Sequence, residues 1–279
     1  MSSSPRGSFI TLVQNKLDEM HPAERRLADF VIDFPGELAS YSATELAKLA
    51  NVSNATVSRF VQKLDFANYD EAKRYVRAER KTGAALFLSS STPEESAVSS
   101  HVAQGQVNLE KTFSGIPQSE IDAVARCMLG AGHVWVIGHR ASHSFASYLH
   151  WQCLQVIPTI SVLPGAGQTM GEYVAGMSKG DCVIVFGLRR RLPKIDLIIR
   201  QIVKTGADVL LISDEGMDRQ RGPRWHFKCQ TAAPGPLFNH VAVLGICHLL
   251  ATRVIELAGP AGRKRLSAIE ASHSELDEL

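Results

Sequence analysis

Apolar residues recur at helical spacing in the first part of the chain. Pro22 stands where a first helical turn would begin, and Leu27, Val31 and Phe34 then follow at the spacing of one helix face until Pro35. Proline is well tolerated in a first turn and ends a helix elsewhere. The pattern therefore predicts a helix between the two prolines.

Two further helices, joined by a short turn, are predicted directly after this one. Ser42 and Glu45 have the spacing of a capping box, in which a serine and an acid three residues later satisfy the first free N–H groups of a helix. Ser53 is placed to cap a second helix, which runs to about Leu64. The apolar side of this second helix consists of Val57, Phe60, Val61 and Leu64. This pattern is typical of a helix-turn-helix, whose second helix fits the major groove of DNA.

The second half of the chain has a different pattern, in which short apolar runs alternate with helical segments. The runs cover residues 133–138, 159–163, 181–187, 208–214 and 225–230. Continuous apolar runs indicate strands that are covered on both faces, and strands that alternate with helices indicate a parallel sheet. We therefore expect an all-α N-terminal domain followed by an α/β doubly wound domain with a five-stranded parallel sheet.

The change of pattern also predicts the domain boundaries. The Ser- and Pro-containing stretch at residues 89–93 interrupts the helical pattern and is poor in core residues, which is typical of a linker. We expect a helix-turn-helix domain over residues 1–82, a linker and connecting helix over residues 83–118, and an effector domain with a C-terminal helix over residues 119–279.

Composition is that of an ordinary globular protein, with 45% hydrophobic residues, 21% charged residues and a net charge of +2 over 279 residues. The basic residues are nevertheless concentrated between Lys48 and Lys81, where eight basic residues face four acidic ones. Such a local excess favours binding to phosphates. The five cysteines form no CxxC pair, which argues against a disulfide framework and a structural zinc site. With no apolar signal core or membrane span, a cytoplasmic protein without membrane contact is expected.

Burial of the apolar side of the second helix would leave a polar side facing outward. The outward-facing residues predicted to bind DNA are Asn54, Thr56, Ser58, Arg59, Gln62 and Lys63. Arginine holds guanine through two hydrogen bonds, and asparagine pairs with adenine or a phosphate. The alternative interpretation is a solvated helical hairpin without a ligand.

Polar residues follow the first and third predicted strands. In parallel sheets of this kind, ligands bind at the carboxyl ends of the strands. The predicted effector-binding residues are Gly138, His139, Arg140 and Ser142 after the first strand, and Gly187, Arg189, Arg190 and Arg191 after the third. Guanidinium groups hold phosphate or carboxylate through paired donors, so a small anionic ligand is expected. Alternatively, the three consecutive arginines form a solvated loop or salt bridges between subunits.

Residues 21–74, HPAERR to DEAKR, resemble the N-terminal domain of RpiR-type bacterial transcriptional regulators nearly end to end. In that family the block that corresponds to residues 53–66 (SNATVSRFVQKLDF) is the recognition helix and its flank. The resemblance therefore places DNA contacts on Ser53, Asn54, Thr56 and Arg59. One difference is Asp65, which stands where the family usually has a glycine.

Residues 120–258 resemble the sugar isomerase (SIS) domain, which in RpiR-type regulators senses phosphosugars or related metabolites. Gly138 and Ser142 match the family's Gly-x-x-x-Ser loop after the first strand. The hydroxyl-rich phosphate loop after the third strand is replaced by residues 187–192, which contain the three arginines. This difference implies cationic contacts to a phosphosugar, a sugar acid or another carboxylate.

Catalytic and metal sites find little support in the sequence. His139, His143 and His150 have no acidic ligand nearby, so no metal and no cofactor are expected. Glu172 is a candidate general base, or alternatively an acid that stabilises a helix N-terminus. We expect a non-enzymatic transcriptional regulator, acting as a repressor, that binds a DNA operator as a homodimer or homotetramer under allosteric control by the metabolite. The alternative is a phosphosugar isomerase with a helical oligomerisation arm.

Overall fold

The computed structural model describes residues 9–33, 38, 41–82, 97–189, 191–192, 194–217, 219–234 and 237–278. Predictions that concern Phe34, Pro35, residues 89–93 and Arg190 therefore lie outside the described residues. The chain forms two units, residues 1–104 with 232–238, and residues 105–231 with 239–279. The two units meet within α6 (Ala97–Phe113). This division does not coincide with the boundaries expected after residues 82 and 118, which stay predictions.

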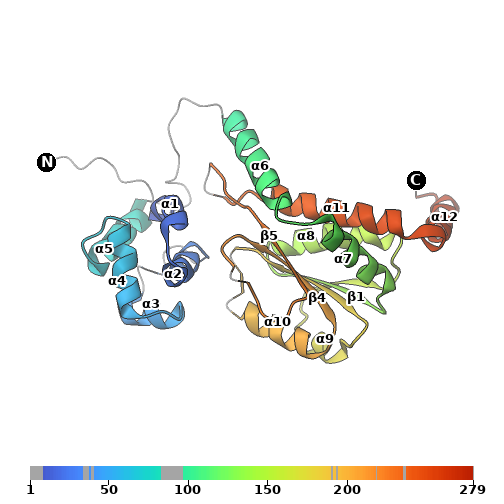
Figure 1. The fold of residues 1–279 in the computed structure, drawn as a ribbon, viewed down its shortest axis with the longest axis horizontal. Helices are drawn as coiled ribbons and strands as arrows, with labels where there is room; N and C mark the ends of the chain where they lie inside the picture. The colour runs from blue at the N-terminus through green and yellow to red at the C-terminus, as the bar shows by residue number, and fades with distance from the viewer. Residues whose placement is uncertain are drawn as a thin grey trace. The chain divides into compact units, whose positions relative to one another are not determined.

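The first unit is a small helical domain (Figure 1). Its elements are α1 (Phe9–Asn15), the 3-10 helix η1 (Leu17–Glu19), α2 (Pro22–Asp33), α3 (Ala43–Leu49), α4 (Asn54–Lys63) and α5 (Tyr69–Thr82). Their apolar sides meet in one core, where Leu27, Leu46 and Phe60 are fully buried. Phe238, from the short segment assigned to this unit, packs against the same core.

Local hydrogen bonds fix the turn between α3 and α4. The predicted capping box is present: Ser42 N donates to Glu45 Oε2 at 2.8 Å, and Glu45 N donates to Ser42 Oγ at 3.2 Å. Between the helices, Asn51 adopts a left-handed conformation with φ of 53°. Ser53 then caps α4 by accepting from Thr56 N at 3.1 Å. The two helices of the predicted helix-turn-helix are thus held by the residues that the sequence indicates.

The second unit contains a five-stranded, fully parallel sheet, as predicted. The strands are β1 (Val134–Gly138), β2 (Ile160–Leu163), β3 (Cys182–Gly187), β4 (Asp208–Asp214) and β5 (Trp225–Cys229), in the order β2-β1-β3-β4-β5. The helices are α6 (Ala97–Phe113), α7 (Gln118–Gly130), α8 (Ser142–Leu154), α9 (Gly171–Gly176), α10 (Ile195–Lys204), α11 (Val241–Leu257) and α12 (Gly259–Leu276).

Helices cover both faces of the sheet (Figure 1). One face packs against α7, α8 and α11 and buries alternate residues such as Val136 and Ile184. The other face packs against α10 and buries the intervening residues, such as Ile137 and Val185. Burial on both faces explains why the strands read as continuous apolar runs.

The strand order also locates the crevice of the sheet. The chain passes from β1 outward to β2, and then returns to the other side of β1 to form β3. Ligands of such sheets bind where the strand order reverses, at the carboxyl ends of the strands. In this unit that point lies between the end of β1 at Gly138 and the end of β3 at Gly187.

The apolar helix α11 packs on one side of the sheet. Among the described residues, no single helix has the length and apolarity needed to cross a membrane. In the same described part of the chain, α11 and α12 taken together have the length and composition of a membrane span, but the two helices are bent by 103° relative to each other.

Candidate nucleic-acid interface and effector site

One side of α4 is polar and exposed. Asn54, Ser58, Arg59 and Gln62 are all exposed. On the opposite side, the predicted apolar residues Val57, Phe60, Val61 and Leu64 are buried. Asn54 also donates a hydrogen bond from Nδ2 to Thr44 Oγ1 of α3 at 3.3 Å, which ties the start of α4 to the preceding helix. The exposed side of α4 therefore carries polar and cationic groups of the kinds that can hydrogen-bond to base edges.

Thr56 does not face outward as predicted, because its side chain is buried and only 3% of the residue is exposed. Thr56 Oγ1 lies 2.9 Å from Ser53 Oγ and accepts a hydrogen bond from Arg59 Nη2 at 3.4 Å. The cap hydroxyl of Ser53 is thereby linked through Thr56 to the Arg59 guanidinium. Thr56 therefore helps to fix the start of α4 and contacts the exposed Arg59 side chain.

Lys63 also departs from the predicted outward-facing set. Its ammonium Nζ lies 2.7 Å from Glu24 Oε2 of α2 and donates to the Glu19 carbonyl oxygen at 2.8 Å. Only 4% of the Glu24 side chain is exposed. Burial alone would raise the pKa of Glu24, but the Lys63 ammonium and the His21 backbone N–H hold this pKa below its usual value. Lys63 therefore anchors α4 to α2.

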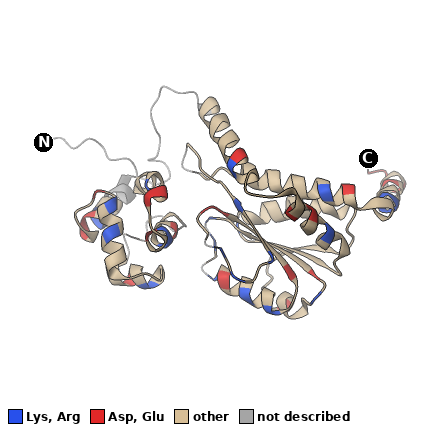
Figure 2. Cartoon of the chain, viewed as in Figure 1, with Lys and Arg blue, Asp and Glu red and all other residues tan. Residues whose placement is uncertain are grey.

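Lys and Arg positions recur along α4 and α5 (Figure 2). Lys48, Arg59, Arg74 and Arg77 are exposed, whereas Lys73 donates to the Tyr41 carbonyl oxygen at 2.6 Å. The side chains of Arg80 and Lys81 lie outside the described residues. Exposed cations close to the polar side of α4 are suited to phosphate contacts that orient a protein on a duplex.

At the end of β1 the backbone packs so tightly that only glycine fits. A Cβ at Gly138 would lie 2.3 Å from the Ser142 carbonyl oxygen. The turn that follows is closed by the N–H groups of Ser142, His143 and Ser144, which donate to carbonyl oxygens three residues back. Ser142 is buried at the start of α8. The predicted Gly-x-x-x-Ser loop thus brings the N-terminus of α8 to the end of β1, where the helix dipole favours negative charge although the first three N–H groups are already bonded.

His139 has an unsatisfied nitrogen in this loop. Its Nε2 atom is buried and finds no hydrogen-bond partner among the described residues. Burial, and to a smaller extent the neighbouring His143, lower the pKa of His139, which keeps the imidazole neutral. Arg140 follows in the left-handed region, with φ of 56°, and is exposed. Buried polar atoms are nearly always satisfied, so His139 Nε2 is an atom that a water molecule or a ligand would satisfy.

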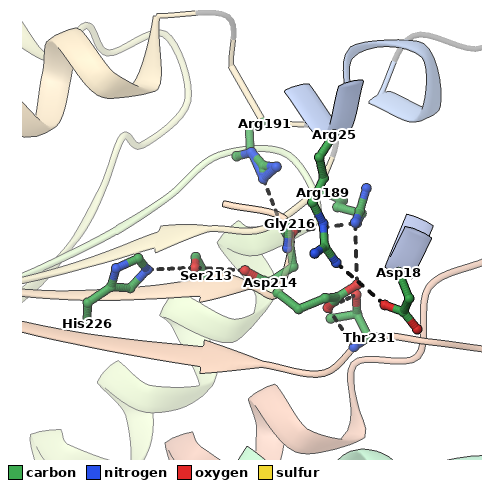
Figure 3. A network of polar contacts seen from close by, with 10 residues as sticks. Asp18, Arg25, Arg189, Arg191, Ser213, Asp214, Gly216, His226 and Thr231 are labelled. Atoms are coloured by element: carbon green, nitrogen blue, oxygen red, sulfur yellow. Dashed lines mark hydrogen bonds and ion pairs between the residues drawn. The ribbon is translucent and has the colours of Figure 1, made fainter. Parts of the chain in front are cut away.

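The arginines after β3 converge on a carboxylate of the chain itself (Figure 3). Arg189 Nε lies 3.5 Å from Asp214 Oδ1, and Arg191 Nη1 lies 2.9 Å from Asp214 Oδ2. The side chains of Arg189 and Asp214 are fully buried. Glu215 completes the cluster, since its Oε1 lies 3.4 Å from Arg189 Nη2 and its Oε2 accepts from both Thr231 N and Thr231 Oγ1.

This cluster corrects the expectation of a solvated loop for Arg189 and Arg191, whereas the expected effector contacts and intersubunit salt bridges stay predictions. Arg189 and Arg191 neither lie free in solvent nor point together at an empty crevice, because Asp214 and Glu215 at the end of β4 hold them. β4 is on the opposite side of β3 from β1, so these guanidiniums turn away from the loop of His139. The adjacent acids at the end of the fourth strand were the sequence signal that could have indicated this pairing.

Gly187 has a packing role at the end of β3. A Cβ there would lie 3.0 Å from Met217 Sδ and 3.3 Å from Leu211 Cδ1, which is tighter than ordinary van der Waals contact. The glycine therefore keeps the end of β3 close to β4 and to the loop that follows it.

The candidate catalytic residue Glu172 is exposed in the first turn of the six-residue α9. A hydrogen bond from Thr169 Oγ1 lowers the pKa of Glu172, whereas a general base for neutral pH needs a raised pKa. In the described part of the chain, no three His, Cys, Asp or Glu side chains form a group that could hold a metal ion. All five cysteines are free.

Comparison with known proteins gives two family matches. Residues 8–82 match the helix-turn-helix domain of the rpiR family, and residues 128–222 match the SIS domain. The chain is 23% identical over 274 residues to the HTH-type transcriptional regulator HexR of Pseudomonas aeruginosa. This alignment covers 95% of each protein. It is 22% identical over 210 residues, or 74% of each protein, to an uncharacterised HTH-type transcriptional regulator of Providencia stuartii.

Two solved structures share the fold. The sugar isomerase domain of an RpiR transcription factor from Sphaerobacter thermophilus has a TM-score of 0.56 and 18% identity, covering 61% of this chain and 96% of that chain. The Vibrio vulnificus NanR protein, complexed with ManNAc-6P, has a TM-score of 0.56 and 14% identity, covering 96% of this chain and 98% of that chain. With an rpiR-family helix-turn-helix domain followed by a SIS domain, the chain belongs to the RpiR-type transcriptional regulators.

Proposed function

We propose that this regulator reads its DNA operator with the exposed side of α4 and represses transcription until a small anionic metabolite binds at the β1–β3 crevice. The observation that carries the DNA-reading role is the division of α4 into a fully buried apolar side and an exposed side formed by Asn54, Ser58, Arg59 and Gln62. Arg59 makes the main base contact, and Ser53 and Thr56 hold it in place.

A gel shift on the DNA upstream of the protein's own operon tests the assignment of Arg59. Arg59→Ala should weaken the sequence-specific complex by roughly 10- to 100-fold and relax the base preference at one position, as expected for loss of a bidentate contact to guanine. Arg126→Ala is the matched control, since Arg126 is an exposed arginine on α7 in the other unit. Unchanged affinity and base preference in Arg59→Ala would show that α4 does not read the operator.

Repression is tested separately in cells. A reporter gene placed behind the operator should be expressed more strongly when the regulator is deleted, and Arg59→Ala should reproduce the deletion. Lower reporter expression in the deletion strain would assign an activator instead.

For the effector, support comes from His139 and its surroundings. A neutral imidazole with an unsatisfied Nε2, a buried Ser142 hydroxyl and the N-terminus of α8 lie together at the crevice. This set suits a ligand that combines hydroxyl groups with an anionic group, such as a phosphosugar or a sugar acid. NanR, which shares the fold, is complexed with ManNAc-6P. We therefore propose that His139, Arg140 and Ser142 bind the effector, with Gly138 allowing the tight turn that brings them to the end of β1.

Thermal unfolding in the presence of ManNAc-6P, other sugar phosphates and sugar acids tests this proposal. The effector should raise the melting temperature of the chain, and His139→Ala should abolish most of that increase. His101→Ala, at an exposed position of α6, is the control. An increase that is the same in His139→Ala and in the unaltered chain would exclude His139 from the site.

The predicted effector contacts of Gly187, Arg189, Arg190 and Arg191 remain a proposal. An anion that contacts Arg189 or Arg191 has to compete with Asp214, which already holds both guanidiniums. Ligand stabilisation that survives replacement of all three arginines would remove them from the site.

The isomerase alternative predicts turnover of the bound sugar phosphate. Glu172 is poorly suited to act as the base, because its pKa is lowered and its side chain is exposed. We expect no conversion of any sugar phosphate that stabilises the chain. Conversion that is lost in Glu172→Gln would favour the enzyme.

A further inference from the structure

The C-terminal helix α12 is only sparsely covered by the rest of its unit, with Leu266 packed against the core. Of its 18 residues, all of which the structure describes, only Gly262 is buried. Isolated helices of this length are marginal in water, and most helices in proteins are stabilised by packing of an apolar side. The helix nevertheless continues to Leu276, whose exposure is 65%. A helix of this kind needs a surface to pack against.

An apolar seam runs along α12. Its members are Gly262, Leu266, Ile269, His273 and Leu276, which are spaced alternately by four and three residues. This is the spacing of the a and d positions of a coiled coil. The seam borders a groove of about 450 Å³ between α12 and α8, whose other wall includes Trp151, Leu154 and Gln155. Trp151 is 68% exposed, although tryptophan is usually well covered.

Apart from Glu270 in its middle, the charges of α12 are segregated along its length. Arg263, Lys264 and Arg265 lie near its beginning, whereas Glu275, Asp277 and Glu278 lie at or just after its end. This arrangement opposes the helix dipole, which favours acids at the beginning and bases at the end. No acid stands three or four residues from Arg263 or Lys264. Ion pairs within the helix therefore do not compensate for the unfavourable interaction of these bases with the helix dipole. Pairing with an antiparallel copy of the same helix would offset it.

We propose that α12 pairs antiparallel with α12 of a second copy of this chain, across a two-fold axis near Ala271. In this arrangement Leu266 lies opposite the partner subunit's Leu276, and Ile269 lies opposite the partner subunit's His273. Each basic beginning then lies beside the acidic end of the other helix, with Arg263 next to the partner subunit's Asp277. The apolar seams fill the groove and cover Trp151. This inference is independent of the effector and of the DNA contacts proposed above.

Charge reversal of the full-length chain tests the pairing by sedimentation equilibrium. Arg263→Glu with Lys264→Glu places acids beside acids, and Asp277→Lys with Glu278→Lys places bases beside bases. Each double variant alone should dimerise at least about tenfold more weakly than the unaltered chain. Mixed in equal amounts, the two variants should form a heterodimer with near-original affinity, because both ends are again complementary.

Arg265 is kept in every variant because it holds the Leu154 carbonyl oxygen through Nε and Nη2. The matched control is Arg200→Glu with Lys204→Glu, two exposed bases on α10, which should leave the dimer unchanged. Circular dichroism confirms that each variant is folded, and recovery in the mixture excludes local damage as the cause. A monomeric unaltered chain, undiminished dimers in the reversed variants, or a mixture that fails to recover would each overturn the proposal.

Discussion

At the scale of single residues, Lys63 shows how a charged side chain on the second helix of a helix-turn-helix can be structural. Its ammonium is paired with Glu24, whose side chain is almost fully buried. Lys63→Met should lower the free energy of unfolding by about 1–3 kcal/mol, less than for a fully buried pair because a quarter of the Lys63 side chain is exposed. Urea unfolding of the isolated variant measures this loss, and Lys48→Met is the control at an exposed site of α3.

The same pair predicts a pH dependence. The folded state lowers the pKa of Glu24 below its ordinary value of 4.5, so the pair stabilises the fold above that pH. This contribution is lost as the pH falls through the lowered pKa of the folded state. The difference in unfolding free energy between the unaltered chain and Lys63→Met should therefore shrink between pH 7 and pH 3. A difference that stays constant over this range would mean that Glu24 does not titrate with the pair.

Residue-level predictions from the sequence succeeded where the helical pattern was unambiguous. The four apolar residues of α4 are buried, and Asn54, Ser58, Arg59 and Gln62 are exposed. Thr56 and Lys63 were misplaced because they lie where the two sides of the helix meet. Their neighbours decided the outcome, and the partner of Lys63 lies 39 residues away in the sequence.

At the scale of elements, the end of α4 shows how a departure from the family pattern strains the backbone. Asp65 is in the left-handed region with φ of 64°, and its N–H donates to the Gln62 carbonyl oxygen. Phe66 N donates to the Val61 carbonyl oxygen at 3.0 Å, which completes a Schellman motif. Glycine is the residue that adopts this conformation without strain, which explains the family preference at this position.

Substitution of Asp65 therefore has a predicted order of stability. Asp65→Gly should raise the free energy of unfolding by up to about 1 kcal/mol, because relief of the strained φ exceeds the added entropy of the unfolded chain. Asp65→Ala should lower it by about 1 kcal/mol, because alanine lacks the local hydrogen bonding that lets aspartate tolerate this region. Chemical unfolding of the unaltered chain, Asp65→Gly and Asp65→Ala measures the three free energies of unfolding. If Asp65→Ala were the most stable of the three, the predicted order would be wrong.

Most elements could be predicted because their signals are local. The capping box at Ser42 and Glu45, the cap at Ser53 and the apolar runs of the five strands all depend on neighbouring residues. The arrangement of Arg189 and Arg191 could not be obtained in this way. It depends on which strand lies beside β3, and the acids that hold the arginines follow β4.

At the scale of the whole molecule, a two-fold dimer that reads DNA predicts a constraint on the operator. Two copies of α4 would contact half-sites about one helical turn, or a whole number of turns, apart. Insertion of about 5 base pairs between the half-sites should therefore weaken binding strongly, and insertion of about 10 should weaken it much less. Competition gel shifts with the three operators measure this, and equal affinity for all three would argue against paired reading.

The close approach at Gly138 limits how the proposed effector site could be redesigned for new inducers. Any other side chain there collides with the backbone of the helix that follows, so a mutant library that includes position 138 would consist mostly of misfolded variants. Diversity is better introduced at His139, Arg140 and His143, which are not packed in this way. New inducer preferences are thus expected from substitutions around an unchanging glycine.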